Sequence, residues 1–151
     1  MTPAEGRRYF EATLDAGDVI EIGWDPTPSG SPYEERIALE GFGLRADLSA
    51  GTLAWYDAAG SGYTTVATGV APGDVVGIAV DIESGDIAAY HGTGSGCTRV
   101  LSETLAPTGQ ITPAVMLGDR GGAASNRLTA RFGSADFDCK PAGYEGPRTI
   151  D

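Results

Sequence analysis

The sequence is poor in basic residues, and this scarcity excludes two classes of partner. Its 151 residues contain 10 Lys+Arg against 21 Asp+Glu, which gives a formal net charge of −11 and a pI near 4.3. Lysine occurs once, at Lys140. Proteins that bind nucleic acid or anionic membranes depend on Lys and Arg to neutralise phosphates. We therefore expect no nucleic-acid partner and no attachment to an anionic bilayer.

Long apolar runs are also missing from the chain. No stretch approaches the roughly 18 apolar residues that a transmembrane helix needs. The first residues, Met1 to Glu5, lack the basic and then apolar pattern of a signal peptide. We expect neither membrane insertion nor a secretory leader.

Histidine is represented only by His91, which excludes a site with several histidine ligands. No G-x-S-x-G motif supplies a serine nucleophile, and acidic pairs arise by chance among so many carboxylates. These residues favour neither a serine hydrolase nor a glycosidase, and we expect no cofactor. The spacing of Asp81, Glu83 and Asp86 could wrap a calcium ion. The same residues suit a hairpin turn, which is the interpretation we favour.

Two cysteines, Cys97 and Cys139, are too few for a disulfide scaffold and lack the spacing of a zinc site. Two buried free thiols are the favoured interpretation. A disulfide between them is the alternative if the protein works outside a reducing cytosol.

What the sequence has in abundance is alternation of apolar and polar residues with a period of two. Such segments are short, end in Gly, Pro, Asp or Ser, and recur along the chain, whereas helical periodicity is almost absent. They include Phe10–Leu14, Asp18–Trp24, Phe42–Leu48, Val75–Val80, Ile87–Tyr90 and Leu128–Phe132. This pattern predicts an all-β fold with almost no helix, an antiparallel sandwich or barrel, in one domain spanning residues 1–151.

The segments between the expected strands contain turn and loop signals. Asp15–Asp18 predicts a hairpin between the first two strands, and Pro72–Asp74 predicts a turn into the strand that follows. Longer loops are expected at four Gly-, Ser- or Pro-rich stretches, Asp25–Pro32, Ala58–Gly62, His91–Gly96 and Gly118–Ser125.

Several of these segments resemble the SPRY domain family, also called B30.2. The G-x-x-Y-F-E pattern of that family matches Gly6–Glu11, and its G-D-V-I-G-V-x-L-D pattern matches Gly73–Asp81. Further matches are Ile22–Trp24, Pro113–Leu117, Leu128–Gly133 with Phe137, and Pro141–Tyr144. The resemblance implies a concanavalin-like, two-sheet β-sandwich of jelly-roll type. It also implies a non-catalytic module that binds a peptide or a protein surface through loops.

Two features depart from the family pattern. The family has a strand or two before G-x-x-Y-F-E, whereas only five residues precede Gly6 here. Either another chain supplies the missing edge or the sandwich is smaller. The F-Y-x-N-G turn of the family is replaced by Ala89–Gly94, so the partner of better-known members does not carry over.

Aromatic and arginine residues near the expected loops are the candidates for ligand contact, because these residue types are enriched at binding hot spots. We select Tyr33, Arg36, Tyr56, Tyr63 and His91. Tyr56 follows Trp55 in a strand-like segment, so one of the two should be core and the other exposed. Trp24 shares a face with Ile20 and Ile22 and should be core.

Composition favours a bacterial or bacteriophage source, and a virion surface component such as a fibre tip, head fibre or decoration protein. The partner would be a protein or a host-surface glycan, and the chain would form a homo-oligomer or part of a larger particle, since bare sheet edges invite pairing. The alternatives are a lectin-like carbohydrate-binding domain and a peptide-binding adaptor in the bacterial cytoplasm.

Overall fold

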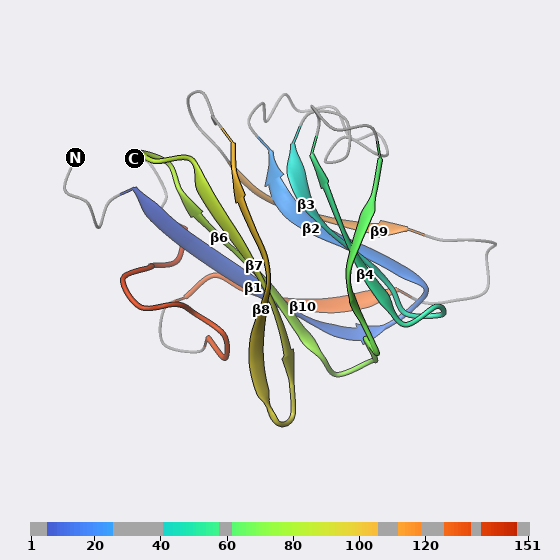
Figure 1. The fold of residues 1–151 in the computed structure, drawn as a ribbon. Helices are drawn as coiled ribbons and strands as arrows, with labels where there is room; N and C mark the ends of the chain where they lie inside the picture. The colour runs from blue at the N-terminus through green and yellow to red at the C-terminus, as the bar shows by residue number, and fades with distance from the viewer. Residues whose placement is uncertain are drawn as a thin grey trace.

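The computed structural model contains two five-stranded sheets that face each other (Figure 1). It describes residues 6–25, 41–57, 62–105, 112–118, 126–133 and 137–147. The strands are β1 (Arg7–Ala16), β2 (Val19–Asp25), β3 (Phe42–Asp47), β4 (Thr52–Asp57), β5 (Thr64–Thr68), β6 (Val75–Asp81), β7 (Asp86–Thr93), β8 (Gly96–Thr104), β9 (Thr112–Gly118) and β10 (Arg127–Arg131).

Within the described residues, the paired strands run antiparallel, and the expected sandwich is confirmed. Sheet A has the strand order β10-β1-β6-β7-β8, and sheet B has the order β5-β4-β3-β2-β9. The described part of the chain contains no helix at all. Accordingly, none of these residues forms a helix long and apolar enough to cross a membrane.

The predicted hairpin at Asp15–Asp18 is wrong. β1 pairs with β6 and β10 in sheet A, whereas β2 pairs with β3 and β9 in sheet B, so the turn carries the chain from one sheet to the other. Gly17 has φ 124°, and a Cβ there would come within 2.0 Å of Asn126 Oδ1. Asn126 Oδ1 accepts a hydrogen bond from the Asp18 amide at 2.7 Å, which ties this crossover to the start of β10.

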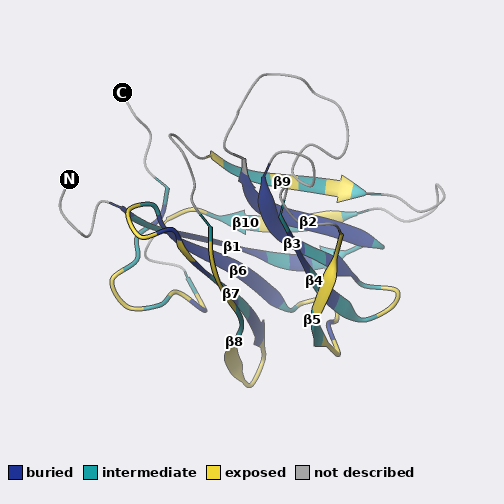
Figure 2. Ribbon diagram, turned by 45° about the horizontal axis from the view of Figure 1, so that its top comes forward, coloured by how far each residue is buried: buried dark blue, intermediate teal, exposed yellow. Residues whose placement is uncertain are grey.

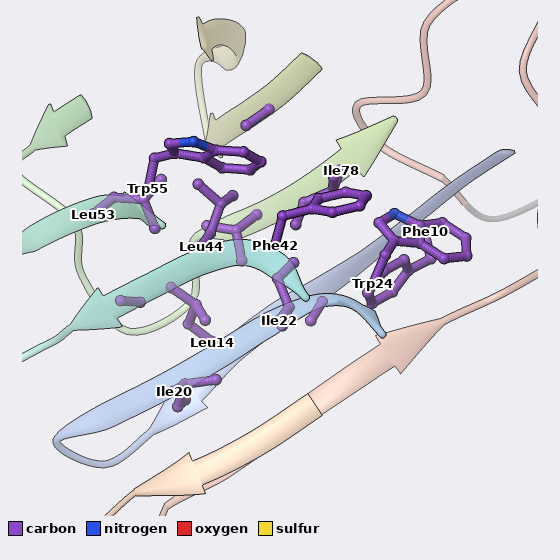
Figure 3. Packing of buried hydrophobic residues seen from close by; sticks show 14 of the residues in the cluster. Phe10, Leu14, Ile20, Ile22, Trp24, Phe42, Leu44, Leu53, Trp55 and Ile78 are labelled. Atoms are coloured by element: carbon purple, nitrogen blue, oxygen red, sulfur yellow. The ribbon is translucent and has the colours of Figure 1, made fainter. Parts of the chain in front are cut away.

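Between the sheets, the core is formed by the inward residues of the alternating segments (Figure 3). Trp24 is 1% exposed and packs edge-to-face against Phe10, with ring centroids 5.2 Å apart, so its expected core position is confirmed. The other large buried side chains of this cluster include Leu14, Ile20, Ile22, Phe42, Leu44, Leu53, Trp55, Val76 and Ile78. In Figure 2, β2, β3 and β6 are buried (dark blue) along most of their length and β1, β4 and β7 along about half of it, whereas the outermost strands β5, β8, β9 and β10 are intermediate or exposed.

The outer face of sheet A is partly covered by residues 137–147, which we call the C-terminal strap. Glu11 of β1 lies beneath the strap and is fully buried. Its carboxylate accepts hydrogen bonds from the amides of Asp138, at 2.7 Å, and Cys139, at 3.0 Å. The Tyr9 hydroxyl donates to the same carboxylate at 2.7 Å. The strap is thus fastened to β1 by a buried charge that several donors satisfy.

A disulfide fastens the same strap to sheet A a second time. The Sγ atoms of Cys97 in β8 and Cys139 in the strap are bonded, with the Cα atoms 5.5 Å apart. The sequence left this pair open and favoured free thiols; in the structure neither cysteine is free. Residues 42 positions apart become neighbours because the strap folds back across β1 toward β7 and β8.

Candidate functional site

A cluster of four polar and aromatic side chains lies on the outer face of sheet B. It consists of Glu21 from β2, Arg45 from β3, Tyr56 from β4 and Tyr63 just before β5, and we call it the Tyr63 cluster. Glu21 and Arg45 are register partners, and their strand neighbours face the core, so these two side chains point away from it. Three adjacent strands therefore bring residues from distant parts of the chain together.

The Tyr63 side chain is exposed but has three partners within the cluster. It is 45% exposed, and its hydroxyl donates to Glu21 Oε1 at 3.2 Å. The Arg45 guanidinium carbon lies 4.8 Å from the centre of its ring, in cation–π geometry. The Tyr56 ring meets it edge-to-face at 5.3 Å. These contacts hold an exposed aromatic ring in one orientation.

Glu21 is the anionic centre of the cluster and is only 1% exposed. Arg45 Nη1 lies 3.9 Å from Glu21 Oε1, and the Arg45 side chain is partly exposed at the rim of the cluster. A buried carboxylate is costly unless it is paired and hydrogen-bonded. The arginine and the tyrosine hydroxyl provide those partners here, so Glu21 positions both groups that reach the surface.

The Tyr56 ring lies over the neighbouring strand β3, where a glycine leaves space for it. Its register partner is Gly43, where a Cβ would come within 2.9 Å of the Tyr56 hydroxyl and 2.2 Å of the Ile22 carbonyl oxygen. Any side chain at Gly43 would therefore displace the tyrosine. Burial, followed by the Glu21 charge, raises the pKa of Tyr56 well above its ordinary value of 10.

At the surface of the cluster, Tyr63 also remains a neutral donor at physiological pH. Partial burial raises its pKa above 10, and the Glu21 charge adds to this, whereas Arg45 opposes it. The cluster thus presents a phenol, a guanidinium and an aromatic edge. This chemistry suits binding.

Of the five ligand candidates chosen from the sequence, the structure brings Tyr56 and Tyr63 together. The expectation that either Trp55 or Tyr56 is exposed is wrong, because Tyr56 is 3% and Trp55 is 5% exposed. Trp55 packs in the core, and Tyr56 is covered on the outer face by its neighbours. Tyr33 and Arg36 lie outside the described residues.

His91 is not in a loop, as the sequence had indicated. Within the stretch His91–Gly96, the first three residues belong to β7 and Gly96 begins β8. His91 is 9% exposed, and its Nε2 lies 2.8 Å from Asp74 Oδ2. That contact ties β7 to the turn before β6, so this residue has a structural position away from the Tyr63 cluster.

The calcium candidates Asp81, Glu83 and Asp86 form a turn instead of a ligand cage. Asp81 Oδ1 accepts hydrogen bonds from the amides of Glu83 and Ser84, and its Oδ2 accepts one from Arg7 Nε at 3.0 Å. No group of three acidic, histidine or cysteine side chains able to hold a metal occurs within the described ranges. The favoured turn interpretation agrees with this geometry.

Sequence reasoning missed Glu21 and Arg45. Both occupy the polar positions of alternating strands, where a charged residue is expected to be solvated. The one available signal was the pairing of opposite charges on adjacent strands, which could be found only once the register was known.

Comparison with known proteins identifies the fold through structure alone. No protein-family model matches the sequence, and no curated protein matches it. The TRIM65 PSpry domain superposes with a TM-score of 0.57 at 18% identity, covering 76% of this chain and 59% of that one. The SPRY domain of human HERC1 has a TM-score of 0.54 at 13% identity, with 83% and 74% covered.

The structure of stonustoxin is also similar, with a TM-score of 0.61 at 19% identity, and 83% of this chain but 20% of that chain are covered. This chain therefore spans less than two thirds of the TRIM65 and stonustoxin chains. The two named SPRY domains share its two-sheet architecture. The fold of this chain is that of a SPRY-like β-sandwich.

Proposed function

We propose that this chain is a non-catalytic recognition module that binds a protein segment through the Tyr63 cluster. The observation that carries the proposal is the exposed Tyr63 ring, held by Glu21, Arg45 and Tyr56. Tyrosine and arginine are enriched at binding hot spots. A side chain that is already ordered loses little conformational entropy when a partner binds.

Two further features support a protein as the partner. SPRY domains, which this fold resembles, are recognition modules, and a rigid sandwich suits that role. The net charge of −11 favours the approach of a partner that carries positive charge. A carbohydrate would stack on an aromatic face, and Arg45 already covers one of the two faces of Tyr63, which reduces the ring surface left for a sugar.

The test uses a displayed library of random twelve-residue peptides, selected on the full chain. Peptides that bind are then measured by calorimetry against Tyr63→Ala and Tyr63→Phe. We expect Tyr63→Ala to weaken binding about tenfold or more, and Tyr63→Phe, which keeps the ring, to weaken it less. Leu117→Ala, which changes a 50% exposed side chain outside the cluster, is the matched control and should leave binding unchanged.

Equal binding of the selected peptides to wild type and Tyr63→Ala would contradict the proposal. So would a failure of the library to yield any binder while a glycan array does, since that result would assign the surface to carbohydrate. Thermal unfolding of each variant shows whether it is folded.

A finer part of the proposal concerns where the module works. The composition led us to expect a virion surface, with the bacterial cytoplasm as the alternative. The disulfide between Cys97 and Cys139 favours a place outside a reducing cytosol. Light scattering after size exclusion tests the particle role: a trimer or larger closed assembly would support it, and a stable monomer of 15.5 kDa would count against an obligate fibre.

A further inference from the structure

A groove of about 690 Å³ lies on the outer face of sheet A, between β7, β8 and the C-terminal strap. Ala88 and Tyr90 contribute to the side formed by β7, and Pro141 and Tyr144 to the side formed by the strap. It is separate from the Tyr63 cluster, which belongs to the other sheet. Figure 2 shows β8, which borders the groove, exposed along most of its length.

The walls of this groove are held in place by the contacts that fasten the strap. Tyr90 packs edge-to-face against Tyr9 at 6.1 Å, and Tyr9 packs in the same way against Phe137 of the strap at 5.0 Å. The Arg7 guanidinium lies 6.0 Å from the centre of the Tyr144 ring. Together with the disulfide, these contacts make the groove a preformed feature of the folded chain.

Charges of opposite sign lie at its two ends. Arg99 is the register partner of Tyr90, whereas Asp86, the partner of Thr104, lies at the far end with Glu103. Among the residues that the structure describes, none forms an ion pair with these three side chains. The Asp86 carboxylate accepts one hydrogen bond from the neutral Thr104 hydroxyl, at 3.2 Å.

The separation of these charges follows from the strand itself. Tyr90, opposite Arg99, stands four residues from Asp86 along β7. At roughly 3.3 Å per residue, the two ends are about 13 Å apart, the span of an equal number of residues in an extended peptide. The aromatic side chains of Tyr90 and Tyr144 line the groove between them.

We propose that this groove is a second binding site, for an extended segment of a partner protein that carries an acidic and a basic side chain four residues apart. The acidic side chain pairs with Arg99, and the basic side chain pairs with Asp86. A central apolar or aromatic side chain packs on Tyr90 and Tyr144. Charge complementarity at both ends selects this occupant over a neutral sugar, which would use the tyrosines alone.

The experiment compares two capped peptides of identical composition by NMR titration of the full chain. The first, acetyl-Glu-Ala-Tyr-Ala-Arg-amide, has its charges four residues apart. The second, acetyl-Ala-Glu-Arg-Tyr-Ala-amide, has them adjacent and cannot reach both ends of the groove. Because an exposed ion pair contributes little, we expect the first peptide to bind about threefold more tightly. Its chemical-shift changes should centre on Tyr90, Arg99 and Tyr144.

Matched variants separate groove binding from general attraction to an acidic protein. Arg99→Gln and Asp86→Asn should each abolish the difference between the peptides. Arg127→Gln changes an arginine of β10, another outermost strand. Asp15→Asn changes a carboxylate that, like that of Asp86, accepts a hydrogen bond from a threonine hydroxyl; the distance is 2.7 Å at Asp15. Both controls should preserve the difference.

Equal binding of the two peptides overturns the proposal, as does a difference that survives either groove substitution. Shifts at these residues with methyl glycosides, but with neither peptide, would overturn it in favour of carbohydrate. Tyr63→Ala should leave the titration unchanged, so failure here and failure of the Tyr63 cluster are distinguishable.

Discussion

The buried Glu11 carboxylate offers the sharpest test of how the C-terminal strap is held. Oε1 accepts hydrogen bonds from the Asp138 amide and from Arg131 Nη1, at 2.7 and 3.3 Å. Oε2 accepts from the Tyr9 hydroxyl and the Cys139 amide, at 2.7 and 3.0 Å. We expect Glu11→Gln, a change of nearly equal size, to destabilise the protein strongly.

The magnitude follows from the number of acceptors that remain. Glutamine has one carbonyl oxygen, so in either orientation its NH₂ group faces one of the two backbone amides. That amide loses a charge-assisted hydrogen bond, which contributes roughly 1.5–3 kcal/mol, and is left buried beside another donor. Arg131 also loses its ion pair with Glu11, while its ion pair with Asp138 is retained. We expect a loss of about 2–4 kcal/mol in the free energy of unfolding.

Urea unfolding gives this free energy, and hydrogen exchange locates the effect. The amides of Asp138 and Cys139 should exchange faster in Glu11→Gln, while those of sheet B keep their relative protection. Glu103→Gln, which changes an exposed carboxylate, is the control and should shift stability by less than about 0.5 kcal/mol. A loss below about 1 kcal/mol, or unchanged protection of the two amides, would refute the reasoning.

Three further predictions concern the disulfide and the ionisable groups. Replacing Cys97 and Cys139 by alanine should lower stability by up to about 4 kcal/mol in thermal or urea unfolding, since the bridge closes a loop of 42 residues; no loss would show that the strap does not depend on it. Burial opposes ionisation of Asp81, but hydrogen bonds from Arg7 and from two backbone amides outweigh it and lower its pKa below 3.8. Ionised Asp81 therefore stabilises the folded protein above pH 3.8, and this stabilisation is lost as the pH falls through the lower pKa that Asp81 has in the folded state. The difference in the free energy of unfolding between wild type and Asp81→Asn should consequently narrow in acid. A difference that stays constant with pH would contradict this. Burial also raises the pKa of Tyr9 and Tyr56. An absorbance titration should therefore show two of the six tyrosines ionising only when the protein unfolds in alkali. Ionisation of all six tyrosines near pH 10 would contradict this prediction.

Local pattern was enough to predict most of the strands. The alternating segments ending at Leu14 and Val80 lie within strands, and those ending at Trp24 and Leu48 extend beyond β2 and β3 by one residue each. The agreement arises because burial of one face imposes a period of two on the sequence. The dependence of this pattern on burial also explains why the sequence did not predict β8. As the outermost strand of sheet A it buries neither face well, so its sequence carries little alternation.

The candidate site was only partly accessible from the sequence. Tyr56 and Tyr63 were selected by residue type, but Glu21 and Arg45 join them through strand pairing that no local pattern encodes. The misplacement of His91 has a similar origin. Its Gly-rich neighbours suit a loop, and pairing with β6 and β8 draws them into β7.

The sequence by itself determined the class of fold and the composition of the core, because both depend on the periodicity of apolar residues and on turn chemistry. Only the tertiary structure decided what covers the polar faces. Glu11 and Glu21 have the same sequence signature as a solvated strand residue, yet both are buried. The strap covers one, and the Tyr63 cluster encloses the other. The pairing of Cys97 with Cys139, the crossover after β1 and the groove on sheet A likewise depend on contacts between segments far apart in the chain, which local propensity does not specify.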